Sequence, residues 1–111
     1  MSSKICHVVL FCLEPVKAAE KLVEPTVRHH LQLMRDTIPG LLEVNFGAAA
    51  SALYKDYVDC TNGYTHCLVS RHVDAAALHV YAGHPNHMSF AEIMKSLGTK
   101  PPIRIDFEIK E

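Results

Sequence analysis

The feature that most constrains this chain is residues 4–13, a segment that is apolar on both faces of a predicted β-strand. Because side chains alternate along a strand, the odd-numbered residues share one face and the even-numbered residues share the other. Each face is mostly apolar: Ile5, His7, Val9 and Phe11 on one, and Cys6, Val8, Leu10 and Cys12 on the other. A strand of this kind needs cover on both sides. We therefore expect helices against one face and a second apolar surface against the other.

The next part of the chain predicts a helix followed by a strand. Apolar residues recur at spacings of four, three and four along residues 27–38, which is typical of a helix with one buried face. Pro25 is tolerated in a first turn and costly inside a helix, so the main helix is predicted to begin near Pro25, after a short preceding turn or helix. Ile38-Pro39-Gly40 ends it. Residues 41–48 read as the second strand.

The second half of the chain predicts two strands and two short helices. Residues 49–62 show no period and predict an irregular connection, which Asn62-Gly63 ends in a turn. Residues 64–73 are predicted to form a strand, and Asp74 a helix N-cap before a short helix through Tyr81. Another helix is predicted from Pro85 to about Leu97. After two prolines, residues 103–109 alternate as a last strand.

The element order is β-α-β-β-α-β, which predicts a single α+β domain over residues 1–111 with a ferredoxin-like fold. In this arrangement a four-stranded antiparallel sheet carries its helices on one face. The other face is also apolar, and 49% of all residues are hydrophobic. A second copy of the same sheet is the simplest cover, so we expect a homodimer that pairs through its sheet faces into a dimeric α+β barrel. The alternative is a monomer with an unusually apolar solvent face.

Composition excludes several classes of protein. The formal net charge is -1, so we expect no nucleic-acid partner. No apolar run approaches the roughly 18 residues that span a bilayer, and the first residues show no cleavage site, so we expect neither membrane insertion nor a signal peptide. The four cysteines form no CxxC pair, which indicates free thiols in a reducing compartment such as the cytoplasm.

The richest segment for chemistry is residues 78–90, which holds a tyrosine and three histidines. His84 lies at the predicted start of a helix and His87 in its first turn, where the helix dipole favours a neutral imidazole. A neutral imidazole accepts protons, and a tyrosine hydroxyl stabilises a developing oxyanion. One hypothesis is therefore an acid–base pair of His87 and Tyr81. The alternative is structural, with His84 capping the turn and His87 bonding a buried carbonyl.

Two further histidines interrupt apolar strands. His7 and His66 lie in the middle of the first and third predicted strands, where a polar side chain needs a partner. These strands are neighbours in the predicted sheet, so both imidazoles, with Val9 beside His7, are expected to line one pocket together with His87 and Tyr81. The alternative is two unrelated core histidines bonded to backbone.

A metal site is a weaker interpretation of the same residues. His79, His84 and His87 supply imidazoles, but no HExxH, HxH or Cys/His spacing is present and no carboxylate lies among them. We therefore predict no metal and no cofactor. His29-His30 and His72 look like surface or helix-flank positions, and no role is predicted for them.

Five segments form a pattern that spans nearly the whole chain: CHVVLF at 6–11, IPGLLEVNFG at 38–47, GYTHCLVS at 63–70, HPNH at 84–87 and IDFE at 105–108. This pattern resembles the stress-responsive dimeric α/β-barrel (Dabb) family, which includes a plant polyketide cyclase, olivetolic acid cyclase. It implies paired ferredoxin-like protomers. It also implies a catalytic role for His87 and Tyr81 and a pocket that includes His7, His66 and Phe90. Two positions depart from the cyclase, with Leu31 in place of a tyrosine and Arg104 in place of an apolar residue.

Two functions are thus expected. The first is a homodimeric stress-response A/B barrel domain protein that binds a small ligand in a pocket lined by His and Tyr, here His7, His66, Val9, Phe90 and His84 beside the His87–Tyr81 pair. The second is a cofactor-free polyketide cyclase or aldol-type lyase that uses His87 as the base. Heme-dependent or flavin-independent oxygenation occurs in other dimeric barrels and is a third reading. Shared histidines alone do not decide among them, because one fold hosts many functions.

Overall fold

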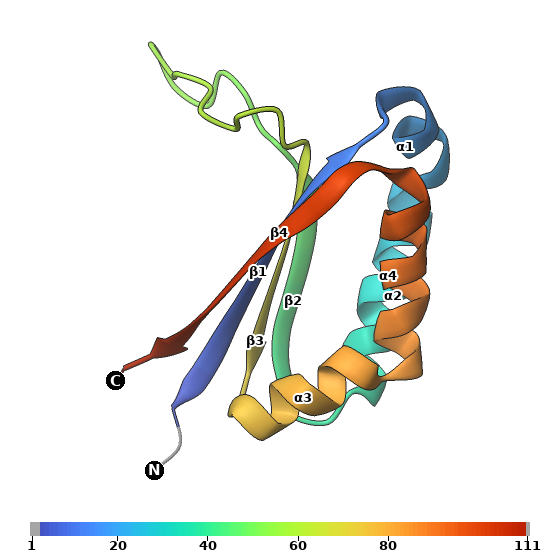
Figure 1. The fold of residues 1–111 in the computed structure, drawn as a ribbon, viewed down its shortest axis with the longest axis vertical. Coiled ribbons are helices and arrows are strands. Elements are labelled where there is room, and N and C mark those ends of the chain that lie inside the picture. The colour runs from blue at the N-terminus through green and yellow to red at the C-terminus, as the bar shows by residue number, and fades with distance from the viewer. Residues whose placement is uncertain (1–2, 111) are drawn as a thin grey trace.

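The computed structural model describes residues 3–110. In chain order the elements are β1 (Lys4–Leu13), α1 (Pro15–Lys21), α2 (Glu24–Thr37), β2 (Leu41–Ala48), β3 (His66–His72), α3 (Ala75–Gly83), α4 (Pro85–Leu97) and β4 (Gly98–Ile109). The strands form one antiparallel sheet in the order β2-β3-β1-β4. Figure 1 shows α2, α3 and α4 on one side of this sheet. The predicted ferredoxin-like α+β fold is confirmed.

Local signals in the sequence account for the helix boundaries. The Asp74 carboxylate accepts a hydrogen bond of 2.8 Å from the backbone N–H of Ala77 and so caps α3. Pro25 and Pro85 lie in the first turns of α2 and α4, where the missing N–H costs nothing. The residues after α2 turn through Gly40, which has a φ of 79°. A Cβ at Gly40 would lie 2.6 Å from the Ala77 Cβ, so this glycine lets the turn approach α3 closely.

The last strand is longer than predicted, because it begins at Gly98 and includes Pro101-Pro102. β4 is an edge strand that pairs with β1 alone, so a residue without an N–H is tolerated there. The β1–β4 register also shifts between Leu10 and Cys12, opposite the prolines. The third strand is shorter than predicted and begins at His66. The connection over residues 49–65 contains no helix or strand, as expected for 49–62.

The core lies between the sheet and the helices. Val9, Val44 and Leu68 of the sheet pack with Met34 of α2 and Phe90 of α4, and all five are buried. These side chains hold α2 and α4 over the sheet, and α3 joins the end of β3 to α4. The arrangement leaves a space beside α4 and β4 that the core does not fill.

The opposite face of the sheet is mostly apolar, and no helix within residues 3–110 covers it (Figure 1). Val8 of β1 pairs with Val69 of β3 and with Ile105 of β4, which is 64% exposed. Ile103 and Phe107 on the same face of β4 are also about half exposed. Among the described residues, no helix is long and apolar enough to cross a membrane.

Candidate functional site

A cavity of about 890 Å³ lies between the helix-facing side of the sheet, α3 and α4, and extends along β4 from Gly98 to Asp106. Most of its wall is apolar. The polar residues at one end come from four different elements. The lining residues used below are His7 and Val9 of β1, Tyr81 of α3, His87 and Phe90 of α4, and Asp106 of β4.

Tyr81 and His87 meet across the corner between α3 and α4. Their ring centroids are 4.2 Å apart with the planes inclined by 36°. The corner is fixed by His84, whose Nδ1 accepts a hydrogen bond of 3.1 Å from the Asn86 N–H and so caps α4. His84 therefore caps the helix, as the structural alternative predicted. It does not line the cavity, where the pocket hypothesis had placed it.

One hydrogen bond defines the tautomer of neutral His87. Its Nδ1 lies 3.2 Å from the backbone oxygen of Ala82, and a carbonyl oxygen only accepts. Nδ1 is therefore the protonated nitrogen, and Nε2 carries the lone pair. Burial lowers the pKa of His87; the Ala82 carbonyl opposes this shift, and the nearby His7 and His84 add to it. His87 is thus a neutral imidazole at pH 7 with one nitrogen able to accept a proton.

Tyr81 is fully buried, and burial raises its pKa to about 12. The Ser70 side chain, which lies near the Tyr81 hydroxyl, opposes this shift. By geometry, however, the Tyr81 Oη is shielded from solvent and makes no hydrogen bond of normal distance and angle with any described residue. A buried hydroxyl without a partner is costly, so this group is a protonated donor with an unused hydrogen bond.

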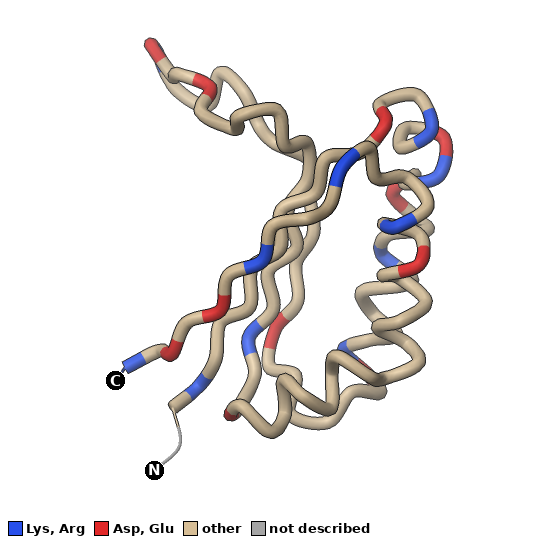
Figure 2. Tube along the Cα trace, viewed as in Figure 1, with Lys and Arg blue, Asp and Glu red and all other residues tan. Residues whose placement is uncertain are grey.

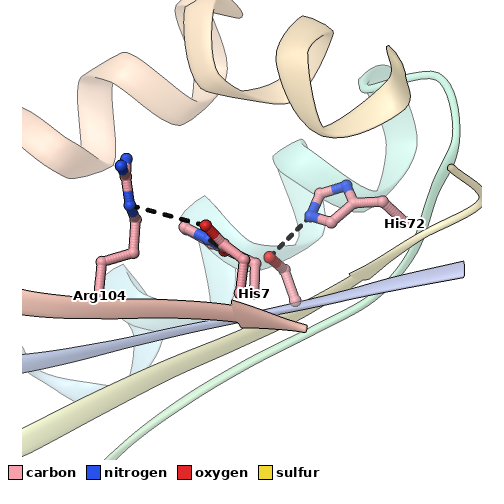
Figure 3. A network of polar contacts seen from close by, with 5 residues as sticks. His7, His72 and Arg104 are labelled. Atoms are coloured by element: carbon pink, nitrogen blue, oxygen red, sulfur yellow. Dashed lines mark hydrogen bonds and ion pairs between the residues drawn. The ribbon is translucent and has the colours of Figure 1, made fainter. Parts of the chain in front are cut away.

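His7 belongs to a polar network that continues into β4 (Figure 3). Its Nδ1 bonds to Oδ1 of Asp106, and the other carboxylate oxygen lies 3.7 Å from Nε of Arg104. His7 itself is only 7% exposed, and its ring centroid lies 5.9 Å from that of Tyr81. The predicted pocket position of His7 is therefore next to the Tyr81–His87 pair.

The interpretation of His72 as a surface or flank residue was wrong. His72 is fully buried; its Nε2 lies 2.8 Å from the Ser70 hydroxyl, and its ring packs 4.7 Å from that of Tyr81. The strand register explains this, because His72 pairs with Ile5 and with Leu41 in the sheet. The pKa of His72 is lowered to about 4, mainly by burial; the nearby His7 and His87 add to this shift, and Asp106 opposes it.

His66 shares the helix-facing side of the sheet with His7 but does not line the cavity. It lies opposite Phe11 near the other end of β1, and its ring stacks on Phe46 at 5.5 Å. Its Nδ1 lies 2.8 Å from the Thr65 hydroxyl. The two strand histidines are therefore not brought together, because four residues of strand separate them.

Asp106 was missed at the sequence level, and Arg104 was noted there only as a departure from the cyclase. Asp106 and Arg104 alternate with Ile103, Ile105 and Phe107 along β4, so they project to the helix-facing side. The alternation of these two charged residues with apolar ones was the sequence pattern that could have placed them on the cavity side. Within residues 3–110, no group of three or more His, Cys, Asp or Glu side chains is arranged to hold a metal ion.

Comparison with known proteins agrees with this architecture. The family model described as "Stress responsive A/B Barrel Domain" matches residues 5–108. The chain belongs to this family. The predicted resemblance is thereby confirmed. A search of curated proteins found no match.

Solved structures of similar fold share little sequence with this A/B barrel domain. A dimeric ferredoxin-like protein of unknown function from Jannaschia sp. CCS1 has 22% identity and a TM-score of 0.75, over 96% of this chain and 99% of that chain. A dimeric protein of unknown function and ferredoxin-like fold from Bacteroides fragilis NCTC 9343 has 20% identity and a TM-score of 0.73, over 96% of each chain. A hydroxynitrile lyase from Passiflora edulis has 16% identity and a TM-score of 0.76, over 100% of this chain and 97% of that chain. At these identities the similarity shows the fold alone.

Proposed function

We propose that this A/B barrel domain protein is a homodimer that binds a small ligand in the cavity beside Tyr81 and His87. The observation that carries the proposal is the cavity itself, about 890 Å³ with a mostly apolar wall and a few polar groups at one end. Cavities of several hundred Å³ with this distribution are typical of small-molecule sites. The polar end offers a neutral imidazole, a protonated phenol and the His7–Asp106 pair.

The dimer is proposed from the uncovered sheet face. Ile103, Ile105 and Phe107 leave an apolar surface on β4 that continues across Val8 of β1 to Val69 of β3. A contiguous apolar patch of this kind is typical of a protein interface. A second copy presents the same patch, so it matches in size and chemistry. Two of the similar structures are described as dimeric, which supports the proposal.

A second candidate function is cofactor-free acid–base catalysis by a polyketide cyclase or aldol-type lyase. The hydrogen bond from His87 Nδ1 to Ala82 favours it, because Nε2 of the neutral ring is left to accept a proton. In this scheme Nε2 removes the proton α to a ligand carbonyl, and the Tyr81 hydroxyl hydrogen-bonds the enolate oxygen. The enolate carbon attacks a second carbonyl of the same molecule, forming a carbon–carbon bond. The imidazolium then returns its proton to the new alkoxide.

The proposal also covers the cellular location of the protein and its role in a stress response. We propose a reducing location such as the cytoplasm, which is supported by the absence of disulfides among Cys6, Cys12, Cys60 and Cys67. A role in a stress response is supported by the description of the family. Induction of the transcript or protein by a defined stress would support that role, and constant levels across a panel of stresses would contradict it.

The experiment for the site is a ligand screen followed by a reaction assay. Wild-type protein, His87→Ala and the control His79→Ala are incubated with a linear poly-β-keto thioester, and ring closure is followed by mass spectrometry. His79 is an exposed histidine on α3 that does not line the cavity. If the protein is a cyclase, ring closure falls at least about hundredfold in His87→Ala, in line with loss of a general base, and is unchanged in His79→Ala. Equal rates in wild type and His87→Ala would contradict catalysis by His87.

A further inference from the structure

We propose that the ligand of this cavity is an organic anion, whose carboxylate or similar group binds between β4 and the end of α4. Arg104, Lys100 and Lys95 are the residues that would bind it. The proposal rests on the ligand-binding function above and names the chemical class of the ligand. The three cations lie within residues 95–104, and the fold turns all three toward the cavity.

The charge around the cavity is unbalanced. The charged side chains that line it are Lys95, Lys100 and Arg104 against a single carboxylate, Asp106. The chain as a whole has the opposite balance, with 11 Lys and Arg against 12 Asp and Glu. Asp106 is also already engaged, since one oxygen bonds to His7. A positive potential in a cleft attracts an anionic ligand and raises its local concentration.

Arg104 is the best placed of the three cations. It projects from β4 toward the helices, on the cavity side of the sheet (Figure 3). Its contact with Asp106 is loose, at 3.7 Å through Nε, and among the described residues its guanidinium has no other partner. The two Nη groups therefore remain available to a carboxylate, which a guanidinium binds through two parallel hydrogen bonds.

The two lysines extend this positive wall. Lys100 lies at the start of β4 with its Nζ 4.3 Å from the centre of the Tyr64 ring. Lys95 lies in the last turn of α4. Figure 2 shows a blue segment on α4 and one near the start of β4 at the same end of the molecule, with a further blue segment partway along β4. All three side chains are largely exposed, so they bind an anion without a large desolvation cost.

The placement also orients the ligand. Arg104 is joined through Asp106 to His7, and His7 lies next to Tyr81. Arg104 therefore lies beside the polar end of the cavity, and a molecule whose anionic group contacts it is held there. A carbonyl group a few atoms from the anionic group then reaches Tyr81 and His87. The geometry fits a keto acid better than a neutral ketone.

A matched pair of probes tests this proposal. The first is 4-oxo-4-phenylbutanoate, an aryl ketone with a carboxylate, and the second is its neutral amide. Both are titrated into the protein by calorimetry or by NMR at low and high salt. The acid is expected to bind at least about tenfold more tightly than the amide, because a charge-assisted bidentate contact is stronger than a neutral one. High salt is expected to weaken binding of the acid and to leave binding of the amide unchanged.

Two variants, one double and one single, test the role of the cations. The double variant Arg104→Gln/Lys100→Gln is expected to bind the acid no more tightly than the amide. Its affinity for the amide is expected to equal that of wild type. Lys55→Gln removes an exposed lysine that does not line the cavity, and it is expected to leave both affinities unchanged. Thermal unfolding of each variant checks that the fold is retained. If the variant binds the acid more weakly and the amide as before, the charge contact is lost while the cavity is intact.

Equal affinities of wild type for acid and amide would overturn the anion proposal while leaving the ligand-binding function in place. If neither probe binds at millimolar concentration, the proposed binding of small keto compounds fails and the anion proposal fails with it. Binding of the amide therefore distinguishes the two failures: the amide binds in the first case and does not bind in the second.

Discussion

The imidazole of His87 lies against the phenol ring of Tyr81, with the ring centroids 4.2 Å apart. This contact joins the first turn of α4 to α3, across the corner that His84 caps. Sequence spacing left open whether His87 is a structural residue or an acid–base residue. The structure makes these roles compatible, because the bond from Nδ1 to the Ala82 carbonyl both satisfies a backbone oxygen and leaves Nε2 to accept a proton.

Removing the Tyr81 hydroxyl is expected to separate stability from function. The Oη has no partner among the described residues, so Tyr81→Phe is expected to leave the free energy of unfolding unchanged or raise it by about 1 kcal/mol. Binding of a carbonyl ligand is expected to weaken. Chemical denaturation and ligand titration measure the two effects, with Tyr54→Phe as a control at an exposed site. A loss of more than about 2 kcal/mol would mean that the hydroxyl has a structural partner.

Stability is expected to fall as the pH falls from about 6.5 to about 4. The pKa of His72 is lowered from 6.5 to about 4 in the folded protein. In that window the unfolded chain binds a proton at His72 that the folded chain does not, so protonation favours unfolding. The effect of His72 is at most about 3 kcal/mol, since one pKa unit corresponds to about 1.4 kcal/mol. Burial also lowers the pKa of His87 and of His66, which adds to the fall in the same direction.

The contribution of His72 is measured by comparing pH profiles. Urea denaturation of wild type and His72→Phe is followed at fixed protein concentration from pH 7.5 to pH 4. The variant is expected to lose less stability over this range, whatever its absolute stability at pH 7.5. Parallel profiles would show that His72 is not held neutral by its surroundings.

A charge on the open face of the sheet is expected to prevent dimerisation. Ile105→Asp places a carboxylate in the centre of the proposed interface, where burial without a partner costs several kcal/mol. Val16→Asp is the matched control, because Val16 on α1 is 65% exposed against 64% for Ile105. Light scattering is expected to show a dimer for wild type and Val16→Asp, and a monomer or aggregate for Ile105→Asp. A dimer in all three would place the interface elsewhere.

Gly40 is expected to be intolerant of substitution. Its φ of 79° is unfavourable for an L-residue, and an added Cβ would lie 2.6 Å from Ala77. Gly40→Ala is therefore expected to destabilise the fold by more than about 1 kcal/mol. Gly83→Ala is the control, since nothing lies within 4 Å of a Cβ at that position in α3. Similar melting temperatures for the two variants would argue against the close approach of this turn to α3.

Much of the fold follows from local signals that the structure confirms. Pro25, Asp74 and Pro85 mark helix starts, and the two-faced pattern of residues 4–13 anticipates a central strand. The start of β4 was not predicted, because prolines usually interrupt strands. Tolerance at Pro101-Pro102 depends on the edge position and the register shift, which only the assembled sheet defines.

The candidate site was only partly predictable. Tyr81, His87 and His7 line the cavity, as does Phe90, whereas His66 does not. The distinction depends on register, since His7 pairs with Ser70 and His66 lies opposite Phe11. His72 has the same strand parity as His66, but its burial depends on packing against α3. The charged residues of the cavity wall lie close together in sequence, but their common orientation toward the cavity depends on the turn from α4 into β4.

The most direct test of the account is an NMR screen of small carbonyl compounds that follows the imidazole signals of the protein. His7 and His87 line the cavity, and His79 is an exposed histidine on α3. The account predicts that compounds which bind shift the signals of His7 and His87 and leave His79 unchanged. Compounds that bind without shifting either cavity histidine, or a broad screen that yields no binder, would contradict a ligand site beside Tyr81.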